Sequence, residues 1–114
     1  MLDTRYSSRR GHAVTDIVQC RLRSTLGGRN RTAKSRARIL VVEHDRPTRE
    51  TLALMLNYYG YEVTLASNGT EARAMLADVT PDLVVMDWRT PGLSGFSLCL
   101  ALRTRWPMMP IVVV

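Results

Sequence analysis

Two short, wholly apolar runs, each followed at once by an acidic residue, constrain this chain more than any other feature. Residues 39–42 (Ile-Leu-Val-Val) precede Glu43, and residues 83–86 (Leu-Val-Val-Met) precede Asp87. Apolar runs without polar alternation are typical of strands buried on both faces of a parallel sheet. Because the carboxyl ends of parallel strands lie at one edge of the sheet, Glu43 and Asp87 are expected to lie there together.

The segments between the apolar runs have the spacing of helices. Apolar residues recur at helical intervals over residues 47–59, 68–79 and 95–106. Further strands are expected over residues 61–66 and 111–114. Strands that alternate with helices predict an α/β fold, in which a doubly wound parallel sheet is joined by right-handed crossovers.

Charge and composition change near Ala37. Residues 1–38 carry ten Lys and Arg and two acids, whereas residues 39–114 carry six Arg and eight acids. The first part is also rich in Ser, Thr, Gly and Asn, and the second is rich in Leu, Val, Ala and Met. We therefore expect a basic, disordered N-terminal tail over residues 1–37 and one domain over residues 38–114.

The tail contains one modest apolar cluster, between Ile17 and Leu26. This cluster is expected to form at most a short helix that is marginal on its own in water. The surrounding basic residues suit either a solvated arm or an arm that contacts nucleic acid or anionic lipid through charge alone. No aromatic residue lies within residues 29–38, which disfavours a surface for single-stranded nucleic acid.

The sequence argues against several other classes. No apolar stretch approaches the roughly 20 residues that cross a bilayer, and the N-terminus lacks the apolar middle region of a secretory signal. Cys20 and Cys99 lie far apart without CxxC spacing, so neither a zinc site nor a redox pair is indicated. We expect a cytoplasmic protein that makes no membrane contact.

The paired acids suggest a specific chemistry. Neighbouring carboxylates raise each other's pKa unless a cation neutralises them, and Mg2+ prefers oxygen ligands of this kind. The ion would also shield the charge of an incoming phosphoryl group. One carboxylate could then act as a nucleophile toward phosphorus and form an acyl phosphate.

Two motifs resemble the receiver domains of two-component response regulators. Residues 38–45 (Arg-Ile-Leu-Val-Val-Glu-His-Asp) resemble their first strand, and residues 84–95 (Val-Val-Met-Asp-Trp-Arg-Thr-Pro-Gly-Leu-Ser-Gly) resemble their third strand and the loop after it. Residues 68–72 look like the start of their second helix. The resemblance covers about residues 38–114 and implies a flavodoxin-like, receiver-like sheet in the strand order 2-1-3-4.

The resemblance also implies a set of site residues. Asp87 matches the aspartate that a histidine kinase phosphorylates in this family. Glu43, Asp87 and the backbone carbonyl of Arg89 match the positions that bind Mg2+. The family usually has two adjacent acids after the first strand, whereas this chain has Glu43, His44 and then Asp45. The remaining ligand is therefore left open between Asp45 and His44.

The receiver pattern is incomplete at its C-terminal end. The family's Ser or Thr after the fourth strand and Lys after the fifth have no counterpart up to Val114, and the only lysine is Lys34. We therefore expect a truncated receiver whose fourth strand is an unpaired edge. Such a chain is expected to be partly folded or to self-associate through that strand, unless the Ile17–Leu26 helix substitutes for the missing cover.

The function implied is that of a phospho-accepting signalling domain, not an enzyme, partnered by a histidine kinase or a phosphotransfer protein. One alternative is a non-phosphorylatable interaction module or fragment. Another is nucleic-acid binding, either through the basic tail or through an output domain that is missing from this sequence. A haloacid-dehalogenase-type phosphatase would need Asp at Arg89, and a dinucleotide-binding fold would need a glycine-rich turn after Val42, so both are excluded.

Overall fold

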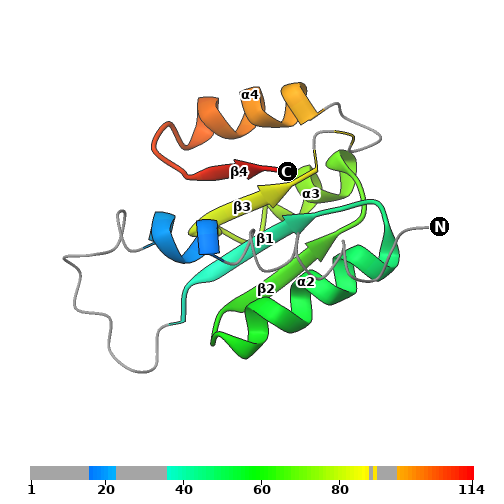
Figure 1. Cartoon of the computed structure of the whole chain (residues 1–114). Helices are drawn as coiled ribbons and strands as arrows, with labels where there is room; N and C mark the ends of the chain where they lie inside the picture. Colours follow the sequence, from blue (N-terminus) through cyan, green and yellow to red (C-terminus); the bar gives the residue numbers. More distant parts are fainter. Residues whose placement is uncertain (1–15, 23–35, 88, 90–94) are drawn as a thin grey trace.

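The computed structural model describes residues 16–22, 36–87, 89 and 95–114. Its centre is one sheet of four parallel strands (Figure 1), arranged in the order β2-β1-β3-β4. The strands are β1 (Arg38–Val42), β2 (Glu62–Ala66), β3 (Leu83–Met86) and β4 (Ile111–Val113). The α/β class and the predicted strand order are both confirmed.

The register of the central strands positions the two acids. In the β1–β3 pair, Val42 lies opposite Met86. The next residue of each strand, Glu43 and Asp87, therefore leaves the sheet beside the other. The ladder continues past the strand ends, because the amide of Glu43 donates to the carbonyl oxygen of Ala66 at 3.0 Å.

The helices are α2 (Arg46–Tyr58), α3 (Gly69–Met75) and α4 (Gly95–Arg105). Asn68 caps α3 by accepting a hydrogen bond from the amide of Glu71. However, α3 ends before the predicted Val79. The amides of Ala77 and Asp78 bond to carbonyl oxygens only three residues back, which tightens the chain out of the α-helix before it enters β3.

The side chains of the sheet divide between two apolar layers. Alternate residues of β1 and β3 point to opposite faces, as the period of a strand requires. One layer contains Ile39, Val41, Leu83 and Val85 together with Leu52 and Leu56 of α2. The other contains Leu40, Val42, Val84 and Met86 together with side chains of α3 and α4. Within the described ranges, no helix has the length and apolar character needed to cross a membrane.

Residues 16–22 differ from the disordered tail that the composition suggests. They form a short helix, coloured blue in Figure 1, whose Val18 and Leu22 are buried in the same layer as α2. The apolar face of the sheet beside α2 supplies the burial that a short helix lacks in water. This packing agrees with the alternative in which a helix near Ile17 covers that face. The rest of residues 1–35 lies outside the described residues, so the boundary at Ala37 stays a prediction.

Candidate functional site

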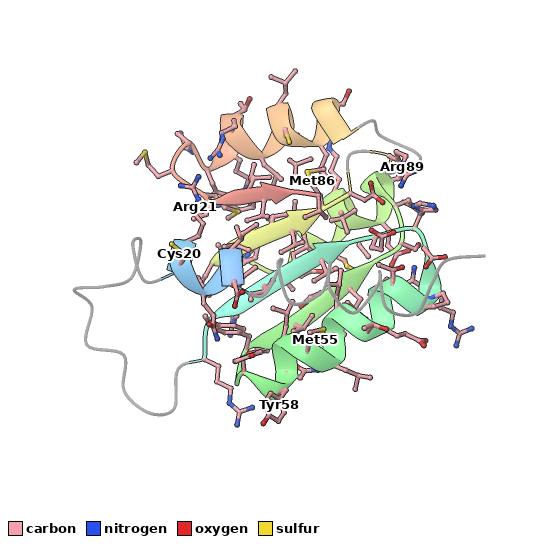
Figure 2. The ribbon with its side chains drawn as sticks, viewed as in Figure 1. Cys20, Arg21, Met55, Tyr58, Met86 and Arg89 are labelled. Atoms are coloured by element: carbon pink, nitrogen blue, oxygen red, sulfur yellow. The ribbon has the colours of Figure 1, made fainter. Side chains whose placement is uncertain are left out.

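Two carboxylates are buried where β1 and β3 end. Glu43 and Asp87 are only 3% and 2% exposed, and they are the buried charged side chains in the described part of the chain. Figure 2 shows this end of the sheet, with Met86 at the end of β3 and Arg89 just beyond it. The predicted pairing of Glu43 with Asp87 is therefore present in the structure.

The environment of Glu43 disfavours its negative charge. Burial raises the pKa of this carboxyl, and the neighbouring charge of Asp87 raises it further. One hydrogen bond opposes these effects, because the amide of Asp45 donates to Glu43 Oε1 at 3.2 Å. A cation placed between Glu43 and Asp87 would remove the repulsion that burial intensifies.

His44 lies against both acids. Its Nδ1 is 3.5 Å from Glu43 Oε1 and 3.9 Å from Asp87 Oδ2, while about half of its side chain stays exposed. One potential ligand atom from each of these three residues lies within 4.8 Å of the others. Two buried oxygens and one imidazole nitrogen therefore converge at the end of the sheet.

Asp45 lies outside this cluster of three potential ligands. It is the N-cap of α2, and its carboxylate accepts hydrogen bonds from the amide of Thr48 at 3.1 Å and from the Thr48 hydroxyl. These bonds lower the pKa of Asp45. Of the two candidates for the remaining ligand, the structure brings His44 to the acids and leaves Asp45 in the cap.

Arg89 contacts the proposed phospho-acceptor through its backbone and its side chain. Its amide donates to Asp87 Oδ1 at 2.9 Å, and its Nε lies 4.0 Å from the same oxygen. The hydrogen bond from the Arg89 amide holds the Asp87 carboxylate in one orientation, with Oδ2 toward His44. The predicted role of the Arg89 carbonyl as a metal ligand stays a prediction.

Arg49 is a site residue that the sequence reasoning missed. Its Nη1 donates to the carbonyl oxygen of Glu43 at 2.9 Å and lies 3.4 Å from that of His44. Arg49 thus ties α2 to the loop that carries the acids. A signal was available in its position, because a cation in the first turn of a helix opposes the helix dipole and needs a compensating contact.

The donor set suits a divalent cation. The carboxylate oxygens of Glu43 and Asp87 fit a hard ion such as Mg2+, whereas the imidazole of His44 fits it less well. Once neutralised, a carboxylate oxygen of Asp87 is a nucleophile that can attack an electrophilic phosphorus. Metal-assisted transfer of a phosphoryl group to Asp87 is the chemistry that this arrangement supports.

Curated relatives with similar sequences are bacterial response regulators. The response regulator MprA of Mycobacterium avium (strain 104) is 44% identical over 77 residues, which cover 68% of this chain and 34% of the relative. The MprA of Mycobacterium bovis (strain BCG / Pasteur 1173P2) matches at the same identity and coverage. The chain thus spans about a third of the length of the curated relatives it matches.

Solved structures show the same likeness. The chemotaxis response regulator CheY4 of Vibrio cholerae is 28% identical with a TM-score of 0.66, over 69% of this chain and 68% of that one. The response regulator TrrA from Thermotoga maritima, solved in complex with Mg2+ and BeF, is 35% identical with a TM-score of 0.64, over 68% and 67%.

The match extends from the sequence to the arrangement of the strands. The family model described as "Response regulator receiver domain" matches residues 39–114, a range that holds α2 to α4 and nearly the whole sheet. The acids at the ends of β1 and β3 lie inside this range. This chain therefore belongs to the response regulator receiver domain family of two-component signalling.

Proposed function

We propose that this chain accepts a phosphoryl group on Asp87 from a histidine kinase or a phosphotransfer protein. The observation that carries the proposal is the buried pair of carboxylates at the ends of neighbouring strands, with Asp87 beside Glu43. Because burying a charged carboxylate costs free energy, buried carboxylates occur mainly where the charge takes part in binding or catalysis. The match to the receiver family supports the use of this charge in accepting a phosphoryl group.

The transfer proceeds by displacement at phosphorus. A carboxylate oxygen of Asp87 forms a P–O bond while the P–N bond of the partner's phosphohistidine breaks. The electron pair leaves with the imidazole nitrogen, which takes up a proton, and Asp87 becomes an acyl phosphate. Such a step depends chiefly on positioning and charge neutralisation.

The residues of this chain hold and orient the reacting groups. The amide of Arg89 fixes Asp87 through Oδ1, and the bond from Arg49 to the Glu43 carbonyl fixes the loop opposite. Glu43, Asp87, the Arg89 carbonyl and His44 would hold the divalent cation, which is Mg2+ in the family. When bound, the cation supplies electrostatic stabilisation of the phosphoryl oxygens.

The wider role is also a proposal. The chain would act in the cytoplasm as a phospho-acceptor signalling domain, not as an enzyme that releases a product. The curated relatives are about three times as long as the matched segment, so an output function would belong to further sequence. Any contact with nucleic acid would be made there, or weakly by the basic N-terminal residues.

Phosphorylation of the purified chain tests this proposal. Acetyl phosphate with Mg2+ should add one phosphoryl group, detected by intact-protein mass spectrometry, and Asp87→Asn should abolish the addition. Asp78→Asn is the matched control, because Asp78 is exposed and lies in the turn after α3. Equal labelling of Asp87→Asn and the native chain would refute the site.

An interaction module that is never phosphorylated is the second candidate. The observation in its favour is that the Arg89 guanidinium lies 4.0 Å from Asp87 Oδ1, while the His44 imidazole lies 3.9 Å from Asp87 Oδ2. The guanidinium could neutralise the acid without a metal ion. A folded chain that takes up no label from acetyl phosphate or from any histidine kinase would favour this candidate.

A further inference from the structure

We infer that His44 makes this centre selective for Zn2+, or an ion of the same borderline class such as Co2+, over Mg2+. The inference deepens the proposed function, on which it rests, by naming the ion that the site prefers. It is carried by the position of one nitrogen atom, Nδ1 of His44, which lies close to one oxygen of each of two buried carboxylates.

The two distances from His44 Nδ1 to the carboxylate oxygens favour a tetrahedral ion. Ligand atoms about 2.1 Å from one tetrahedral ion lie about 3.4 Å from one another. Adjacent ligands of an octahedral Mg2+ at the same bond length lie only about 3.0 Å apart. The distances from His44 Nδ1 to Glu43 Oε1 and Asp87 Oδ2 are 3.5 Å and 3.9 Å, nearer to the tetrahedral spacing.

The chemistry of the donors points the same way. Imidazole nitrogen is a softer ligand than carboxylate oxygen and suits Zn2+ and Co2+ better than Mg2+. A tetrahedral ion would not need the Arg89 carbonyl, which is a further ligand only for six-coordinate Mg2+, so one His and two carboxylates would leave one of its positions open. Catalytic zinc sites commonly have three protein ligands, with water or substrate in the fourth position. Here that position would accept water or a phosphoryl oxygen.

The structure also explains why Asp45 does not restore an all-oxygen site. Its carboxylate accepts two hydrogen bonds from Thr48 as the cap of α2. Moving it toward Asp87 would give up both bonds and the cap. The main chain of the loop is held as well, because Arg49 bonds to the carbonyl of Glu43 and approaches that of His44.

Relative affinity tests the inference, since many oxygen sites also bind Zn2+ more tightly than Mg2+. Zn2+ and Mg2+ are titrated by calorimetry into the full chain, in a background carrying His12→Asn and Cys20→Ser, which removes the other histidine and the exposed cysteine. His44→Asp should lower the ratio of the Zn2+ to the Mg2+ association constant by about tenfold or more. Glu50→Asp, on the exposed face of α2, is the control and should leave the ratio unchanged.

A second experiment uses the native chain, so its result does not depend on whether a variant folds. In the native chain with 15N-labelled histidine, Zn2+ should shift the Nδ1 resonance of His44, and Co2+ should broaden or displace its ring protons. An unchanged ratio in His44→Asp, or an undisturbed His44 ring at saturating Zn2+, overturns the inference.

The metal selectivity and the proposed function can each be refuted without the other. Phosphorylation of Asp87 with Mg2+, accompanied by an undisturbed His44 ring in Zn2+, removes the selectivity and leaves the proposed function. Binding of Zn2+ through His44, in a chain that no phosphodonor labels on Asp87, supports the metal preference and removes the proposed function.

Discussion

The amide of Asp87 donates a hydrogen bond to the carbonyl oxygen of Val42 at 3.0 Å, so the proposed phospho-acceptor is tied to the last residue of β1. This bond extends the ladder by one step beyond the two strands. Asp87 and Glu43 are consequently held by the backbone of the sheet, although they lie in connecting segments. A site built in this way keeps its acids together even when like charges repel.

The first prediction concerns the repulsion at Glu43. Because burial and Asp87 raise the pKa of Glu43 above its ordinary value of 4.5, this group stabilises the metal-free protein fully below that pH. The contribution is lost as the pH rises through the folded-state pKa. Stability in chelator is therefore expected to fall as the pH rises above 4.5, and Glu43→Gln should flatten that part of the profile.

Urea unfolding at several pH values measures this effect. The control is Glu50→Gln, since Glu50 is exposed and its ion pair with Arg46 at 2.9 Å contributes little to stability. A native profile that rises over the same range, or one that Glu43→Gln leaves unchanged, would mean that Glu43 is not destabilised by its ionisation.

The second prediction separates the two roles considered for Asp45. Asp45→Ala removes the cap of α2 and should cost about 1 kcal/mol of the free energy of unfolding near neutral pH. The pKa of Asp45 is lowered, so its stabilisation is present above the ordinary value of 3.8 and is lost as the pH falls through the folded-state pKa. Asp45→Asn should keep most of the stability, because asparagine also caps helices.

Metal titration of the same variants completes this test. Asp45→Asn should bind Zn2+ and Mg2+ as the native chain does, because the Asp45 carboxylate bonds to Thr48 and not to the acidic cluster. A tenfold loss of affinity with intact stability would instead make Asp45 a ligand.

Most of the fold could be predicted because its signals are local. Apolar runs before acids mark β1 and β3, and Asn68 with Glu71 marks the start of α3. Gly60 marks the end of α2, where its φ of +89° suits glycine far better than other residues. Alternation of strands and helices then leaves few topologies to consider.

What the sequence could not decide depends on contacts distant along the chain. The helix of residues 16–22 depends on the packing of Val18 and Leu22 against the sheet. No local sequence pattern shows that an apolar face of the sheet is available to this helix. The choice between His44 and Asp45 also involves a distant residue, because only the folded chain shows that His44 lies beside Asp87 while Asp45 bonds to Thr48. An aspartate two residues before Pro47 is compatible with either a cap or a ligand until the geometry of the loop is known.

The third prediction tests the helix of residues 16–22 as a structural part of the domain. Leu22 is 4% exposed and packs in the layer of α2, so Leu22→Ala should cost about 2 kcal/mol or more in the free energy of unfolding. Ile17 lies on the same helix but is 44% exposed, and Ile17→Ala should change the stability by less than about 0.5 kcal/mol. Equal effects in urea unfolding would show that the helix does not pack on the sheet in solution.

The last prediction concerns the outer edge of β4. In the described part of the chain, β4 pairs with β3 alone, which leaves its other side as a sheet edge. Its central residue Val112 is buried, whereas Val113 is 53% exposed. An apolar edge strand is a template for pairing with another chain, although a strand of three residues offers few bonds.

We therefore expect weak self-association through β4, seen as a sedimentation coefficient that rises with protein concentration. Val113→Lys should suppress it, because a charged side chain at the edge must be desolvated when a second copy pairs there. Leu54→Lys is the matched control, since Leu54 is 72% exposed on α2, away from that edge, and its replacement should leave the association unchanged. If Leu54→Lys suppressed association as strongly as Val113→Lys, the contact would be general apolar adhesion and not strand pairing. A native chain whose sedimentation coefficient stays constant across the whole concentration range would show that the edge of β4 does not recruit a second copy.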